Sequence, residues 1–181
     1  MKHRLFIGLR PPENIITQLS DVMGDIAGAR WQSDAQLHLT LLFLGACDHH
    51  QAEDVAHSLL GVHFPCFTLQ VDGLGHFQKP GQAGSLWAAV RPHAPLLQLH
   101  QKLTTRLRPL GLDLPARAYL PHITLARLDR YAGSPAAFLA QYAGLSSAPF
   151  AVTEFCLFES HRTRAGAHYE IVARYALARG A

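Results

Sequence analysis

The hydrophobic pattern alternates between short apolar runs and segments of helical spacing. Residues 5–9 form an apolar run typical of a buried strand. After Pro11 and Pro12, apolar residues recur at helical spacing as far as Ile26, which predicts a helix with proline in its first turn. The remaining elements of this part are predicted as a strand over 37–44, a helix over 51–60 and a strand over 67–74.

The same order of elements then begins again. The pattern predicts a strand over 85–90, a helix over 95–107, a strand over 122–128, a helix over 135–142, a strand over 150–158 and one extra strand over 169–177. Two β-α-β-α-β units in succession indicate a duplication. We therefore expect one domain over 1–181 with two lobes that face each other, drawn from approximate halves 1–80 and 81–181.

One short motif occupies the matching strand of each half. The first half has Leu37-His38-Leu39-Thr40-Leu41 and the second has Pro121-His122-Ile123-Thr124-Leu125. On a strand, residues two apart share a face, so each histidine and threonine point together while the apolar residues between them face the core. Two facing lobes would bring both His-x-Thr pairs to one cleft.

The bare motif is not specific. With 12 His in the chain, a His-x-Thr triplet arises by chance about half a time. His161-Arg162-Thr163 is a third copy in a charged stretch, where we expect no catalytic role. The apolar frame and the equivalent positions distinguish the other two copies. From the residues alone, a catalytic pair and two structural strand histidines both remain open.

Composition narrows the class of protein. The formal net charge of +3 suits an anionic ligand, but Lys and Arg are scattered along the chain. Cys47, Cys66 and Cys156 form no Cys-x-x-Cys pair, which favours a reducing compartment. No apolar segment approaches the ~20 residues of a membrane span. We expect a cytoplasmic monomer that does not bind membranes.

A metal site receives no support from the pattern. His49, His50 and His57 cluster in the sequence, yet no Cys or carboxylate completes a recognisable zinc spacing. Histidines on a solvated loop and helix explain them better. Two imidazoles are sufficient for acid–base chemistry without a metal, because one can take a proton while the other gives one. We expect no metal and no cofactor.

Longer segments resemble a known family. They are Arg4-Leu5-Phe6-Ile7, Trp31 ahead of residues 37–45, the run 117–127 around the second motif, and Val152-Thr153-Glu154-Phe155-Cys156-Leu157 with the later Tyr169. Together they resemble the two-histidine phosphoesterase superfamily, specifically the RNA 2',3'-cyclic phosphodiesterases, also called 2'-5' RNA ligases. The resemblance implies a bilobal α+β fold with mainly antiparallel sheets facing a central groove. Tyr119 stands where phenylalanine is expected.

The resemblance also implies a reaction. His122 would activate water, His38 would protonate the departing 3' oxygen of an RNA 2',3'-cyclic phosphate end, and a 2'-phosphomonoester would remain. Thr40 and Thr124 would donate to the phosphate oxygens. With a 5'-hydroxyl in place of water, the same site would form a 2'-5' RNA linkage.

Two further residues follow from the resemblance, with one difficulty. Phe43 would stack on a base and Arg127 would bind phosphate. Each lies five residues after its histidine, and this odd offset turns a side chain to the opposite face of a straight strand. Either a bulge or strand end re-aims them, or they are core and supporting residues.

Two other functions use the same residues. One is a phosphodiesterase for a small cyclic nucleotide or ADP-ribose cyclic phosphate, which a comparison of mononucleotide and oligonucleotide substrates would distinguish. The other is a non-catalytic module that binds RNA ends. A binder would need only Thr40, Thr124 and Arg127, which leaves both histidines without a purpose.

Overall fold

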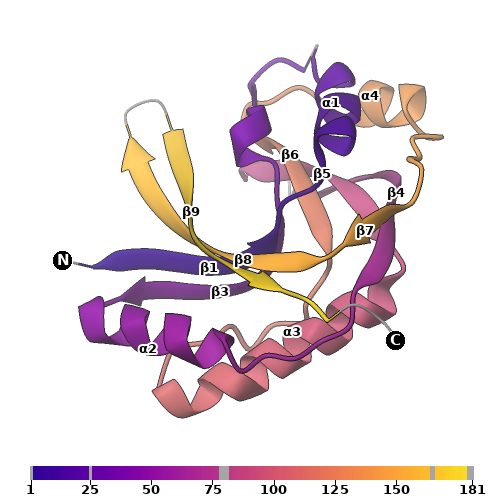
Figure 1. The fold of residues 1–181 in the computed structure, drawn as a ribbon. Helices are drawn as coiled ribbons and strands as arrows, with labels where there is room; N and C mark the ends of the chain where they lie inside the picture. The colour runs from indigo at the N-terminus through magenta and orange to yellow at the C-terminus, as the bar shows by residue number, and fades with distance from the viewer. Residues whose placement is uncertain (1, 25, 78–81, 164–165, 179–181) are drawn as a thin grey trace.

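The computed structural model describes residues 2–24, 26–77, 82–163 and 166–178. Strands and helices alternate along most of this length (Figure 1). In chain order the elements are β1 (His3–Leu9), α1 (Glu13–Asp21), β2 (Ala29–Trp31), η1 (Asp34–Gln36), β3 (Leu39–Cys47), α2 (His49–Leu59), β4 (Phe67–Phe77), β5 (Gly84–Arg91), α3 (His93–Leu107), η2 (Arg108–Leu110), β6 (His122–Leu128), α4 (Ala136–Gln141), β7 (Phe150–Val152), β8 (Glu154–Thr163) and β9 (Gly166–Ala176).

The described strands form one curled sheet. Its order is β7-β4-β5-β6-β3-β1-β8-β9, and β2 also pairs with β6. Every ladder between named strands is antiparallel. The predicted α+β class, with its repeated units and mainly antiparallel sheet, is confirmed.

Strands are exchanged between the two repeated units. β4 comes from the first unit but pairs with β5 and β7 of the second. β8 comes from the second unit but pairs with β1 of the first. We call β1, β3, β8, β9, α2 and α3 lobe 1, and β2, β4, β5, β6, β7, α1 and α4 lobe 2. In Figure 1, α2 and α3 lie together below the sheet and α1 and α4 lie together above it.

Buried leucines attach the helices to the sheet. In α3, Leu96, Leu99, Leu103 and Leu107 are fully buried at helical spacing and belong to the main core with the inner residues of β1 and β3. Lobe 2 has a smaller core in which Phe138 of α4 packs with Leu86 and Ala126 of the sheet. Each lobe therefore has helices on one face and leaves the other face of its strands for the site.

Several bounds differ from the sequence prediction; β3, for example, begins at Leu39 rather than at Leu37, so His38 is the residue before the strand. α1 ends at Asp21 rather than near Ile26, and Gly24 follows with φ of 151°, a value that a helix does not accommodate. The strand predicted over 150–158 is two strands, β7 and β8, which break at Thr153 as the chain passes from one lobe to the other. β2 was missed because its three residues are too short to show a period.

Candidate active site

The two His-x-Thr motifs meet at the centre of the sheet. β3 and β6 are joined by a single antiparallel pair, Leu39 with Ile123. In an antiparallel register, the residues on either side of that pair also lie across from one another. Each histidine therefore lies across from the threonine of the other motif, and the structure brings His38, Thr40, His122 and Thr124 into one cluster.

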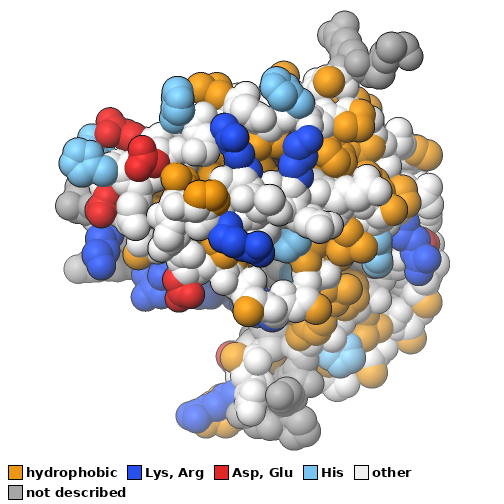
Figure 2. All heavy atoms as spheres, turned by 90° about the horizontal axis from the view of Figure 1, so that it is seen from below, with side chains coloured by type: hydrophobic (Ala, Val, Ile, Leu, Met, Phe, Trp, Pro, Cys, Tyr) orange, Lys and Arg blue, Asp and Glu red, His pale blue; other side chains and the backbone are white. Residues whose placement is uncertain are grey.

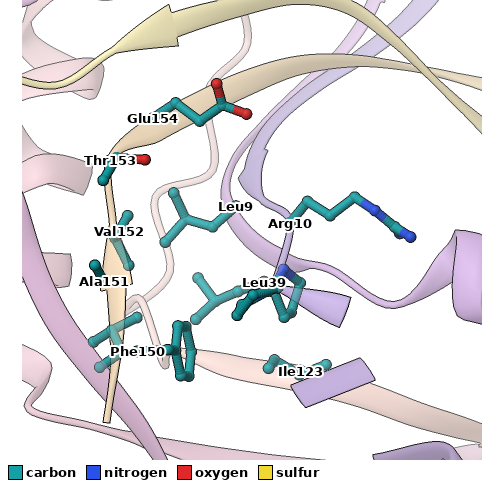
Figure 3. Close-up of a pocket in the computed structure, with 12 residues that line it drawn as sticks. Leu9, Arg10, Leu39, Ile123, Phe150, Ala151, Val152, Thr153 and Glu154 are labelled. Atoms are coloured by element: carbon teal, nitrogen blue, oxygen red, sulfur yellow. The ribbon is translucent and has the colours of Figure 1, made fainter. Parts of the chain in front are cut away.

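The face behind this cluster is apolar. Leu39 and Ile123 alternate with the motif residues, so they point to the opposite side. There, together with Leu9 and Phe150, they line a cavity of about 170 Å³ (Figure 3). Arg10 borders the same cavity but donates to the backbone carbonyl of Asp34 at 2.9 Å. No motif histidine lines this cavity, because the motif side chains point to the other face of the sheet.

Backbone carbonyls set the tautomer of both imidazoles. Nδ1 of His38 lies 2.7 Å from the carbonyl oxygen of Gln36, and Nδ1 of His122 lies 2.8 Å from that of Leu120. A carbonyl oxygen only accepts, so Nδ1 carries the hydrogen in each neutral ring. Each motif thus uses the carbonyl two residues before its histidine, which leaves Nε2 as the reactive nitrogen on both rings.

Aromatic rings enclose His38. Its ring centroid lies 4.8 Å from that of Phe6, 4.9 Å from that of Tyr169 and 5.8 Å from that of Phe158. The side-chain amide of Gln36 donates to the carbonyl of Ala167, which ties β9 beside the histidine. Burial is the main reason that the pKa of His38 falls to about 4, and the positive charge of Arg127 adds to the effect. Without a ligand, His38 is neutral at pH 7.

His122 has a more open surrounding. Its ring lies 5.6 Å from that of Phe77, in a T-shaped arrangement, and 5.9 Å from that of Trp87. Burial lowers the pKa of His122, and the positive charges of Arg127 and Arg117 lower it further. Burial and nearby positive charge therefore favour the neutral form of both histidines.

A bulge in each motif strand resolves the odd offset of Phe43 and Arg127. In β3, Gly8 pairs with Thr40 and Ile7 with Leu42, so Leu41 is an extra residue. In β6, Trp87 pairs with Thr124 and Leu86 with Ala126, so Leu125 is the extra one. Each bulge lies three residues after its histidine and returns the fifth residue to the histidine's face.

The pairs beyond the bulges agree with this orientation. Phe43 pairs with Phe6, whose ring also contacts His38, and Phe43 is 44% exposed. Arg127 pairs with Ser85 on the same strand as Trp87, and its side chain is exposed. Neither residue belongs to the core, so both side chains are available on the face of the sheet that holds the motifs.

Thr40 is held from two directions. Its hydroxyl lies 3.1 Å from Nε2 of His38, and while that ring is neutral the hydroxyl is the donor. Its backbone carbonyl accepts from the hydroxyl of Tyr119 at 3.1 Å. The Tyr119 ring stacks on the His100 ring of α3, with centroids 4.3 Å apart. Nδ1 of His100 in turn donates to the backbone carbonyl of Leu41 at 2.7 Å. The tyrosine in place of phenylalanine thus anchors the first motif.

Sequence reasoning missed most of the aromatic surround. Tyr169 and Phe6 entered only as parts of a resemblance, and Phe77, Trp87 and Phe158 were not selected. These residues come from five strands, β1, β4, β5, β8 and β9, and non-local pairing places them beside the histidines. An alternating strand pattern with an aromatic on the motif's face is the only signal that the sequence carries for them.

Other candidate groups lie elsewhere. His161 of the third motif lies across from His168 in the β8–β9 hairpin, and its Nε2 is 3.3 Å from a Glu170 oxygen. In the described ranges, no group of three or more His, Cys, Asp or Glu is arranged to hold a metal ion. No described helix combines the length and hydrophobicity needed to cross a membrane. Figure 2 shows the face formed by α2 and α3, where basic side chains stand apart rather than in one patch.

Comparison with known proteins places the chain in a family. The sequence model of the 2'-5' RNA ligase superfamily matches residues 11–164. An RNA 2',3'-cyclic phosphodiesterase of Thermotoga maritima is 30% identical over 134 residues, or 71% of each chain. One of Escherichia coli K12 is 31% identical over 144 residues, covering 78% of this chain and 76% of the relative.

Solved structures agree with the sequence comparisons. The apo crystal structure of E. coli LigT has a TM-score of 0.79 and 26% identity, and the match covers 97% of this chain and 98% of that one. The resemblance inferred from the sequence is confirmed. With the family match over most of its length and enzymes of one activity among its relatives, the chain belongs to the 2'-5' RNA ligase superfamily and is a cyclic phosphodiesterase of that superfamily.

Proposed function

We propose that the chain hydrolyses RNA 2',3'-cyclic phosphate ends to 2'-phosphomonoesters, with His38 and His122 as its acid–base pair and without a metal ion. The observation that carries the proposal is the matched orientation of the two imidazoles. Nδ1 of each donates to a carbonyl, at 2.7 Å from Gln36 and 2.8 Å from Leu120, on strands joined at the centre of the sheet. Two Nε2 atoms then remain for a phosphodiester between them.

The negative charge of the substrate sets the protonation state of His38 and His122. In the free protein the pKa of His38 is about 4 and that of His122 is lowered, so both rings are neutral at pH 7. A bound cyclic phosphodiester carries one negative charge, which raises the pKa of an adjacent imidazole. Binding therefore favours uptake of one proton and prepares one acid and one base.

The reaction then needs two proton transfers. Nε2 of His122 takes a proton from water as the water oxygen attacks phosphorus. The bond from phosphorus to the 3' oxygen breaks, and that oxygen takes a proton from Nε2 of His38. When His38 is protonated, Nε2 becomes a donor, so the Thr40 hydroxyl hydrogen is released to bond a phosphate oxygen. Thr124 has the equivalent place beside His122.

Two exposed side chains complete the site. Arg127 has the fixed planar donors that suit phosphate oxygens, and its charge lowers the pKa of both histidines, which indicates that it is near them. Phe43 is 44% exposed beside Phe6 and offers a face on which the terminal base stacks. Replacing water by a 5'-hydroxyl would run the same chemistry toward a 2'-5' linkage.

The decisive assay is incubation of the purified protein, in EDTA, with a short RNA that bears a 2',3'-cyclic phosphate, followed by identification of the terminal phosphate. We expect a 2'-phosphate, with turnover lost in His38→Ala and His122→Ala. His161→Ala is the matched control, because it removes the histidine of the third motif, and it should retain activity. Turnover that survives in either cleft variant, or that EDTA abolishes, would reject the mechanism.

Substrate size separates the remaining alternative. A phosphodiesterase for a small cyclic nucleotide or ADP-ribose cyclic phosphate would use the same four motif residues. An RNA enzyme should act faster on a cyclic-ended oligonucleotide than on the corresponding nucleoside 2',3'-cyclic phosphate, because flanking nucleotides add contacts. Equal kcat/KM values for the two substrates would favour a small cyclic phosphate, rather than RNA, as the substrate of this protein.

A further inference from the structure

Lobe 2 carries an aromatic face that the proposed hydrolysis does not use. The rings of Phe77 and Trp87 lie 5.1 Å apart at 32°, and both contact the ring of His122. Phe77 is 42% exposed, although it adjoins a motif histidine. A large aromatic side chain left open beside reacting groups is typical of a surface that a ligand covers.

The strands are built to accommodate this face. Gly75 of β4 lies across from Trp87 of β5, and a Cβ atom at Gly75 would lie 2.3 Å from the indole ring. Only glycine lets the indole lie flat on β4. Nε1 of Trp87 is buried and has no hydrogen-bond partner within the described residues.

Lobe 1 also has an aromatic pair beside its motif histidine, but there the pair is covered. β8 lies beside β1 as β4 lies beside β5, and Phe158 pairs with Phe6. These two rings stack 4.8 Å apart, each is 3% exposed, and Tyr169 of β9 packs edge-on against Phe6. On the outer edge of β4, β7 pairs only with Phe67–Leu69, so in the described part of the chain no strand flanks the end with Phe77.

We propose that the Phe77–Trp87 face binds the base of the nucleotide whose 5'-hydroxyl takes the place of water, so that this face serves the formation and cleavage of 2'-5' linkages. This inference rests on the proposed function, in which His122 is the base. In an in-line displacement the entering and leaving oxygens lie on opposite sides of phosphorus. The entering hydroxyl is on the His122 side, so its nucleoside lies over lobe 2, next to Phe77.

The chemistry is balanced in both directions. In ligation the 5' oxygen attacks phosphorus and gives its proton to His122, while the bond to the 3' oxygen breaks and that oxygen takes a proton from His38. The phosphate then joins O2' to O5'. In cleavage the 3'-hydroxyl gives its proton to His38 as its oxygen attacks phosphorus, the bond to O5' breaks, His122 protonates O5' and the 2',3'-cyclic phosphate forms. Only these reactions involve a second base on the His122 side.

The test compares two substrates that differ by that base. One is 2'-5'-linked adenylyl-adenosine and the other is the 2'-methyl phosphate diester of adenosine. Both leave adenosine 2',3'-cyclic phosphate. We expect Phe77→Ala to lower the ratio of kcat/KM for the first substrate to that for the second by roughly 5- to 150-fold, the range that stacking one base contributes. Phe77→Tyr, which keeps the ring, should preserve both values.

Two kinetic outcomes would overturn the inference. An equal fall for both substrates would mean that Phe77 supports the common part of the site, and no fall for either would mean that no base rests on it. Hydrolysis of adenosine 2',3'-cyclic phosphate in the same variants reports separately on the proposed function. Gly75→Ala, which displaces the indole, should reproduce the selective loss.

A binding measurement keeps the two proposals distinguishable. In a Trp31→Phe background, Trp87 is the remaining tryptophan, and we expect adenosine to quench its fluorescence in a way that Phe77→Ala abolishes. Quenching without turnover of any cyclic phosphate would retain the base site and reject the proposed function. Turnover without quenching would retain the function and overturn the base site.

Discussion

The same His-x-Thr motif occupies two different environments in this molecule. In lobe 1, three aromatic rings surround His38, and its pKa falls to about 4. In lobe 2, His122 lies beside an exposed phenylalanine, and burial lowers its pKa without that enclosure. The backbone contact is the same for both rings, since Nδ1 of each histidine donates to the carbonyl two residues earlier. The repeat thus sets which nitrogen reacts, while the neighbouring strands set how readily it charges.

Alanine at either histidine is the strongest way to test whether both environments serve one reaction. We expect His38→Ala and His122→Ala each to lower kcat on a cyclic-ended RNA by about two or more powers of ten, since each removes one proton transfer. Steady-state rates at saturating RNA give this value, and urea unfolding should show that both variants fold. If only one variant were impaired, the two rings would not be partners.

The pH dependence of the unfolding free energy should report how strongly lobe 1 buries His38. The folded pKa of His38, about 4, lies below the unfolded value of ~6.5. Between these values the unfolded chain binds more protons, so stability is complete above pH 6.5 and falls, by up to about 3 kcal/mol, as pH drops toward 4. His38→Gln should flatten the plot of unfolding free energy, from urea melts, against pH. An unchanged slope would mean that His38 is not buried as described.

The threonines offer a finer test of the comparison. Thr40→Val and Thr124→Val should each cost roughly 1.5–3 kcal/mol of transition-state stabilisation, seen in kcat/KM, for one hydrogen bond to a charged group. Thr40→Val also removes the donor to neutral Nε2 of His38, so we expect it to raise the pKa of His38 and shift the pH–rate profile. Normal kinetics in both variants would show that these hydroxyls point away from phosphate.

The smallest expected effect concerns the anchor of the first motif. Tyr119→Phe removes the bond to the carbonyl of Thr40 and should lower the unfolding free energy by about 1 kcal/mol. Tyr175→Phe is the matched control, because that hydroxyl also donates to a carbonyl at 3.1 Å, on Ala56 of α2. We expect only Tyr119→Phe to alter kcat/KM measurably. Equal kinetics in the two variants would limit Tyr119 to stability.

Local sequence patterns predicted most of the helices and strands, but they did not predict which strands pair. The sequence predicted the strands that hold both motifs, and the matching apolar frames identified them as equivalent. It could not show that β4 crosses to lobe 2 or that β8 crosses to lobe 1, because such pairing depends on residues far apart in the chain. The rings around each histidine were missed for the same reason.

The offset of Phe43 and Arg127 shows where periodicity fails. A strict two-residue period turns both side chains away from their histidines. The extra residues Leu41 and Leu125 reverse that result, and nothing in two leucines within apolar runs distinguishes a bulge from a regular strand. The resemblance placed both residues at the site, and the bulge in each strand explains how their side chains come to lie on the same face as the histidines.

The exchange of β4 and β8 bears on the origin of the fold. A chain that ended after the first unit would hold β1 and β3 as a pair but would leave β4 without its neighbour β5. A second copy could complete it by the same exchange, as a twofold-symmetric, domain-swapped dimer with one His-x-Thr motif from each subunit. Each unit of the present molecule would then correspond to one subunit of such a dimer, with the difference that one unit encloses its histidine and the other leaves it open.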